Sequence, residues 1–224
     1  MTVILSGVLG LAVGAAIGLW SLRLRGADAE HEGGLRVTLS AVLLAVAFVA
    51  LAVRYGVGLE LVELCSFVAV LLMLSLTDLD AFRIPNACIA TALAIRVAYL
   101  ATCCALGAIG LRELWFYAIS ALGVGVALAV VVIVCDWWLG SASMGGGDLK
   151  LFVTAAAYVG WQQSVLLVFV ACVLGIVSSP LFGGGMRQAL GSTKPFPFGP
   201  SIALSCLITL LCGEPLVAWY VGML

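Results

Sequence analysis

The sequence predicts an all-α fold, a polytopic membrane helix bundle of about eight transmembrane helices. Three observations support this fold class. Of the 224 residues, 64% are hydrophobic and only 9% are charged, whereas a typical soluble domain is about one quarter charged. The mean hydropathy is +1.26, well on the apolar side. Apolar runs as long as a membrane span recur along the chain, so lipid is the expected solvent.

Each apolar run corresponds to one expected helix, because about 20 apolar residues cross a hydrocarbon core of about 30 Å. The first run has no cation before it and is followed by Arg23 and Arg25, which favours a retained anchor over a cleaved signal peptide. The sixth run is short, so it is either a half-buried helix or one that continues past Trp161. The runs lie near 2–22, 36–53, 61–77, 87–107, 115–135, 149–160, 163–182 and 201–222.

The distribution of positive charge sets the expected orientation, with the N-terminus outside. Four links then lie on the cytoplasmic side and hold seven of the ten lysines and arginines, as the positive-inside rule requires. These links lie near 23–36, 78–86, 136–150 and 183–200. We expect an anchor helix with a short cytoplasmic linker over 1–35 and a membrane-embedded core over 36–224.

Two stretches interrupt the apolar pattern and are expected to be loops. Residues 26–34 are polar, too short to fold alone, and contain the single histidine, His31, which we expect to be solvated. Glycines at 183–185 and three prolines within 195–200 exclude a helix over that link.

The net charge and the cysteines exclude several function classes. A net charge of −1 leaves no basic surface for nucleic acid, which is excluded as a partner. None of the eight cysteines forms a C-x-x-C pair, and all lie in or beside apolar runs. Neither a zinc site nor a disulfide framework fits this pattern, so we expect buried, unreactive thiols.

Two aspartates stand out because carboxylates are costly near membrane depth. Asp78 ends the third run, seven residues before Pro85 breaks the helix, and Asp148 opens the sixth run directly after three glycines. Both lie on the cytoplasmic side in the expected topology, so they can meet although 70 positions separate them. Each alone would also fit an ordinary role at a helix end.

The surroundings of these aspartates suit a reaction that two carboxylates perform together. The glycines lack a Cβ, so the backbone there can adopt positive φ and come close to a substrate chain or to the neighbouring helix. Two facing carboxylates share one proton: the ionised one deprotonates a water while the protonated one polarises a carbonyl, as in aspartyl proteolysis. Asp80 lies about 200° around the helix from Asp78, which leaves it a supporting role in positioning or in contact with a basic substrate segment.

At these residues the sequence resembles the type IV prepilin peptidases, membrane-embedded aspartyl proteases with a G-x-G-D motif. One family motif is an aspartate seven residues before Pro-Asn, and the other is G-x-G-D followed by x-K. A looser match, Pro197-Phe198-Gly199-Pro200, precedes the last run. The first motif corresponds to Asp78, Pro85 and Asn86, and the second to Gly145, Gly146, Gly147, Asp148 and Lys150.

The resemblance implies that Asp78 and Asp148 are the catalytic pair, and that Asp80 and the other motif residues bind substrate or support the pair. It implies removal of the basic leader from prepilins or pseudopilins at the cytoplasmic face of the inner (plasma) membrane, for a type IV pilus or for protein secretion. No metal or other cofactor is implied. The implied partners are the prepilin substrate and membrane lipid, with the oligomeric state open, a homo-oligomer included.

One departure from the family concerns a second activity. Many bacterial members carry a cytoplasmic domain with two cysteine pairs between the first two spans and also methylate the new N-terminus. Here that region is the ten residues from Gly26 to Leu35 and has no cysteine. We therefore expect a short form that acts as a peptidase only.

Other readings remain open at this stage. A small polytopic transporter or channel subunit would bind protons or cations with acids near the bilayer midplane, whereas Asp78 and Asp148 are at span ends. A presenilin-like protease would need Tyr-Asp and Pro-Ala-Leu elements, but Thr77 precedes Asp78 and no Pro-Ala-Leu occurs. Arg96 falls near mid-membrane and needs a partner, for which Glu63 has a suitable depth.

Overall fold

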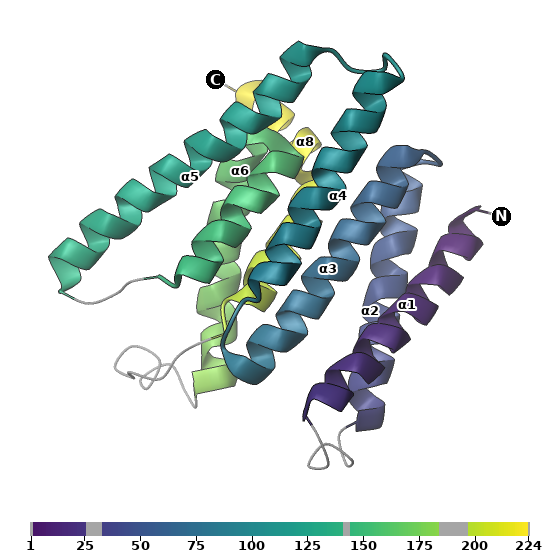
Figure 1. Cartoon of the computed structure of the whole chain (residues 1–224). Coiled ribbons are helices and arrows are strands. Elements are labelled where there is room, and N and C mark those ends of the chain that lie inside the picture. Colours follow the sequence, from purple (N-terminus) through teal and green to yellow (C-terminus); the bar gives the residue numbers. More distant parts are fainter. Residues whose placement is uncertain (1, 26–32, 141–143, 184–196, 224) are drawn as a thin grey trace.

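The computed structural model describes residues 2–25, 33–140, 144–183 and 197–223, and within these ranges the protein is a bundle of seven helices without strands (Figure 1). All seven are long and apolar enough to cross a membrane, which confirms the expected fold class. The helices are α1 (Thr2–Arg25), α2 (Gly33–Tyr55), α3 (Leu59–Ala81), α4 (Asn86–Ala105), α5 (Leu111–Leu139), α6 (Gly146–Gly183) and α8 (Gly199–Val221).

Most of the sequence expected to form loops at 26–34 and 183–200, with His31, lies outside the described residues. The ends of these two stretches are helical, because α2 begins at Gly33, α6 ends at Gly183 and α8 begins at Gly199. The prolines therefore do not exclude a helix at Pro200, which is tolerated in the first turn of α8.

Helix α6 contains two segments that run in opposite directions. Gly160 has φ 77° and ψ 173°, which no helix accommodates, and both ends of α6 lie at the same end of the bundle (Figure 1). The second segment packs antiparallel to α8, since Ser178 is 3.2 Å from Ser201 near the start of α8 and Gln163 lies against Gly213 near its end. The short sixth run therefore ends at Gly160. Counting both segments brings the described helices close to the eight expected spans.

The centre of the bundle lies where α2, α3, α6 and α8 meet. Large side chains there are almost completely enclosed, among them Leu51, Phe67, Leu167 and Ile202. Lipid is as apolar as these side chains, so close packing contributes more to helix association than exclusion of water does.

Helix α1 packs along α2 at the edge of the bundle (Figure 1). A Cβ at Gly10 would lie 2.6 Å from the Cα of Ala45, and one at Gly14 would lie 2.5 Å from the carbonyl oxygen of Ser40. Only glycine permits this separation of the two backbones, and small residues are typical of such contacts between transmembrane helices.

The outer surface of the bundle is apolar. On α5, Ser120 is the single buried residue, and Trp137 and Trp138 are each 85% exposed. All eight cysteines are free, but Cys172 and Cys212 are exposed, so the expectation that every thiol is buried is wrong. In a bilayer an apolar side chain can face outward to lipid. This explains why the tryptophans of α5 and two of the cysteines lie on the outer surface.

Candidate active site

A tight turn after α3 positions Asp78 at one end of the bundle. Phe82 adopts a left-handed conformation (φ 50°, ψ 38°) and donates its N–H to the carbonyl oxygen of Asp78 at 2.8 Å. Pro85 then occupies the N-cap of α4. The last turn of α3 thus holds Asp78, which is only 5% exposed.

A backbone amide of α8 binds the Asp78 side chain. The N–H of Gly199 donates to Oδ2 of Asp78 at 2.8 Å. A Cβ at position 199 would lie 2.8 Å from that oxygen and 3.1 Å from the Asp78 Cβ, so a side chain does not fit. The partial positive charge of the α8 N-terminus also favours a carboxylate here. Sequence reasoning gave Gly199 no role, although the Pro197–Pro200 match pointed to its neighbourhood.

The first turn of α6 brings Asp148 to the same end of the bundle. The N–H of Gly145 binds the Asp148 carboxylate, which also interacts electrostatically with Asp78. The turn after α3 touches the glycine run, because a Cβ at Gly147 would lie 3.0 Å from the Cβ of Ile84. Two segments that are far apart in the sequence therefore place their carboxylates together.

The glycine run before Asp148 allows neighbouring atoms to approach closely, and its backbone has no positive φ angle. The positive φ that these glycines allow is not used, since Gly146 and Gly147 already belong to the first turn of α6. A Cβ at Gly145 would lie 3.0 Å from Oδ2 of Asp148, whereas Gly146 has open space around it. Gly145 and Gly147 therefore allow the approach of the carboxylate and of the neighbouring turn.

A side-chain hydrogen bond connects the two motifs. Nζ of Lys150 donates to Oδ1 of Asn86 at 3.0 Å. The bond joins the first turn of α6 to the first turn of α4. It therefore helps to fix the position of Asp148 relative to the turn that follows Asp78.

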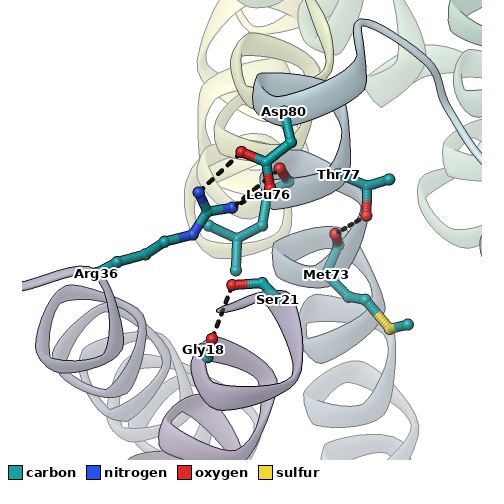
Figure 2. A network of polar contacts seen from close by, with 7 residues as sticks. All are labelled: Gly18, Ser21, Arg36, Met73, Leu76, Thr77 and Asp80. Carbon is teal, nitrogen blue, oxygen red and sulfur yellow. Dashed lines mark hydrogen bonds and ion pairs between the residues drawn. The ribbon is translucent and has the colours of Figure 1, made fainter. Parts of the chain in front are cut away.

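Asp80 binds Arg36 of α2, as Figure 2 shows. The Arg36 guanidinium donates to both Asp80 carboxylate oxygens at 2.8 and 2.6 Å and to the carbonyl oxygen of Leu76 at 3.2 Å. The two charged side chains are 13% and 19% exposed. The pair ties the start of α2 to the last turn of α3, which fits a positioning role for Asp80.

Arg96 has the partner that its depth requires. Its Nη1 donates to both carboxylate oxygens of Glu63 at 2.9 and 3.1 Å, so the partner that depth allowed but could not decide is Glu63. This pair lies apart from the two aspartates.

The arrangement around Asp78 and Asp148 is suited to acid–base chemistry. Two carboxylates, each held by a backbone amide at a helix N-terminus, can bind one water and one carbonyl group between them. Within the described ranges, no three His, Cys, Asp or Glu side chains are grouped as metal ligands.

Comparison with known proteins identifies the family. The model of the type IV leader peptidase family matches residues 65–179, about half of the chain, and this match includes Asp78 and Asp148. The chain belongs to this family. The matched range also contains Asp80, the other residues of both motifs and Arg96, whereas Gly199 and Arg36 lie outside it.

Three relatives, each named prepilin leader peptidase/N-methyltransferase, illustrate the extent of the similarity. The Bacillus subtilis protein is 26% identical over 179 residues, 79% of this chain and 66% of the relative. The Pseudomonas putida protein is 29% identical over 206 residues, 88% of this chain and 66% of the relative. The Aeromonas salmonicida protein is 33% identical over 85 residues, 37% of this chain and 28% of the relative. The chain thus spans less than two thirds of these relatives, and no solved structure matches significantly.

Proposed function

We propose that this family member is a leader peptidase that removes the N-terminal leader of type IV prepilins or pseudopilins by a two-aspartate mechanism. The observation that carries the proposal is that the turn after Asp78 and the first turn of α6 with Asp148 pack together at one end of the bundle, through Gly147 against Ile84 and the Lys150–Asn86 hydrogen bond. Their place at helix ends, and not at mid-span, does not favour a transporter.

In the proposed mechanism the two carboxylates hold one proton between them. The ionised carboxylate takes a proton from a water, whose oxygen adds to the scissile carbonyl carbon while the other carboxyl group protonates the carbonyl oxygen. When the tetrahedral intermediate collapses, the C–N bond breaks and the proton taken from water passes to the leaving amine. The second carboxyl group recovers its proton from the hydroxyl group. Gly199 holds Oδ2 of Asp78, leaving Oδ1 for the reaction.

The proposed substrate follows from the location of the aspartates. A prepilin joins a basic leader to an apolar helix, so the helix can lie in lipid beside the bundle while the junction reaches the interface. We place this interface at the cytoplasmic face of the inner membrane. All the residues of the proposed site belong to the core over 36–224.

We further propose that the protein does not methylate the new N-terminus, although its relatives are also named N-methyltransferases. The stretch between α1 and α2 is short and contains no cysteine. Mass spectrometry of a product cleaved in the presence of S-adenosylmethionine tests this, since an added methyl group would contradict it.

The decisive experiment is cleavage of prepilin-like substrates by purified protein in detergent or membranes. We expect Asp78→Asn and Asp148→Asn to lower the cleavage rate by about 1,000-fold or more, because each change removes one partner of a pair that acts as a unit. Asp136→Asn, in the last turn of α5, is the matched control and should cleave normally. Wild-type rates in either site variant would refute the assignment.

A further inference from the structure

A buried polar cluster lies inside the bundle, away from the two aspartates. At its centre is Arg96, about midway along α4, with its ion pair to Glu63 of α3 at 2.9 Å. The two side chains are only 7% and 2% exposed. A charged pair at this depth is costly in a membrane protein, so its retention calls for a physical reason beyond stability.

The Arg96 guanidinium also binds two backbone carbonyl groups of α6. Its Nε donates to the carbonyl oxygen of Ala157 at 2.8 Å, and its Nη2 donates to that of Tyr158 at 3.4 Å. Both carbonyls belong to the last turn before Gly160. In a continuous helix they would accept from amides four residues further on, but the chain reverses before those amides. Water is absent from the membrane interior, so a side chain must supply the donors.

The length of the first α6 segment explains why its end is buried. From Gly146 to Gly160 the segment rises about 21 Å, less than the hydrocarbon core of about 30 Å. The segment is thus shorter than a membrane span, and its C-terminal end is enclosed by the protein, with Ala157 9% and Tyr158 6% exposed. Arg96 is positive where the helix dipole leaves a partial negative charge, and Glu63 balances the remaining charge.

Other contacts fix the same helix end. The Tyr158 hydroxyl donates to the carbonyl oxygen of Ala92 at 2.7 Å, and the Tyr158 ring stacks on Phe67 with centroids 3.8 Å apart. The Tyr117 ring of α5 lies 4.3 Å from the Arg96 guanidinium carbon. Helices α3 and α4 thus contact the end of the segment whose beginning carries Asp148, and α5 lies beside it, since a Cβ at Gly160 would lie 3.1 Å from the Phe116 ring.

We propose that Arg96 is a positioning residue of the peptidase: by capping the buried end of the first α6 segment, it sets the height of Asp148 relative to Asp78. The proposal rests on the proposed function. Nine residues of helix, about 14 Å, separate Asp148 from Ala157, so a shift at the capped end is transmitted along a rigid rod to the carboxylate. An error of about 1 Å at a reacting group can cost about 100-fold in rate.

The experiment separates the cap from the ion pair. Glu63→Gln removes the negative charge but leaves every Arg96 donor, so we expect its kcat to stay within about threefold of the wild type. In the Glu63→Gln, Arg96→Met double variant no buried charge remains, so the lost cap is the main change. Its kcat should be about 100-fold below that of Glu63→Gln, with KM changed by less than about twofold, because substrate binding is untouched.

A third variant keeps the test decisive if the methionine variant does not fold. In Glu63→Gln, Arg96→Lys one amine can still donate to the Ala157 carbonyl, so its kcat should lie between those of the other two. The matched control is Arg54→Met with Glu214→Gln, which removes another interhelical Arg–Glu pair (2.6 Å) and should leave kcat unchanged. A kcat in the lysine variant equal to that of Glu63→Gln would overturn the proposal, as would a Glu63→Gln protein as slow as the double variants.

Hydrogen–deuterium exchange of the same proteins provides a readout that needs no substrate. Peptides covering 149–158 should exchange about tenfold faster in the Glu63→Gln, Arg96→Lys protein than in Glu63→Gln, while peptides of α2 stay unchanged. If the wild type cleaves nothing but the exchange rises, the proposed function fails and the cap stands. Unchanged exchange over 149–158 would refute the cap whatever the activity.

Discussion

Asp78 obtains its hydrogen-bond donor from Gly199, 121 residues further along the chain. The donor is a backbone amide, so among single substitutions only proline, which has no N–H, would delete it, whereas any other side chain at 199 can displace it. At the scale of single residues this contact is the most sensitive test of the site, because the surrounding space is already filled by the carboxylate.

We predict that Gly199→Ala lowers kcat/KM for prepilin cleavage by about 100-fold, because the new Cβ would push the Asp78 carboxylate away from Asp148. The thermal unfolding midpoint in detergent should change little in comparison. Gly123→Ala, at a position with open space in α5, serves as the control. A Gly199→Ala protein with normal kcat/KM would show that the amide contact does not position Asp78.

Sequence patterns select Asp78 and Asp148 as candidates because a carboxylate at a break in an apolar run is chemically conspicuous. They also indicate that Arg96 needs a partner, but depth makes Glu63 only one candidate, and the structure supplies the pairing. Gly199 escapes such reasoning because a glycine amide looks the same wherever it occurs among 26 glycines. The Arg96 contact with α6 escapes it too, because an acceptor carbonyl leaves no trace in the sequence.

At the scale of helices, the contact between α1 and α2 is separable from the site. The two backbones approach closely at Gly10 and Gly14, whereas Asp78, Asp148 and Gly199 belong to α3, α6 and α8. The expected division into an anchor over 1–35 and a core over 36–224 stays a prediction, and its boundary falls inside α2, which begins at Gly33.

We predict that Gly14→Leu loosens α1 and costs about 1–3 kcal/mol, but leaves the cleavage rate unchanged. Thermal unfolding in detergent and the cleavage assay measure the two effects on one sample. Gly34→Leu, where nothing lies within 4 Å of an added Cβ, is the control for bulk alone. Loss of cleavage in the Gly14→Leu protein would mean that α1 belongs to the working core.

Helix boundaries are largely predictable because length and apolarity suffice to place a span in lipid. The short sixth run is predicted to end near Gly160, and it does. Its reversal inside the bundle is not predictable from the run itself, since the same residues could continue past that glycine. Whether the helix stops at Gly160 or continues past it is decided by the tertiary contacts of Ala157 and Tyr158.

At the scale of the whole molecule, orientation decides which compartment supplies the substrate. The excess of cations in the links on the side of Asp78 and Asp148 predicts that this end faces the cytoplasm. The turn holding Phe82 lies at this end, and the link holding Val57 lies at the opposite end of α3.

We predict that a charged thiol reagent added outside intact cells labels Val57→Cys but not Phe82→Cys in a cysteine-free background. The side chains of Val57 and Phe82 are 75% and 49% exposed, so neither is hidden inside the protein. Labelling is therefore decided by whether the reagent can reach the side of the membrane on which each residue lies. After the cells are opened both should react. Labelling of Phe82→Cys from outside would invert the topology and move the site to the opposite face.

The long sequence separation between Asp78 and Gly199 also bears on biogenesis. A chain is inserted from its N-terminus, so α3 enters the membrane long before α8 has been synthesised. Until α8 arrives, the Asp78 carboxylate lacks its amide partner and the pair is incomplete. If the proposed function holds, we expect the nascent protein to leave neighbouring polypeptides intact until α8 has been inserted and supplies the amide of Gly199.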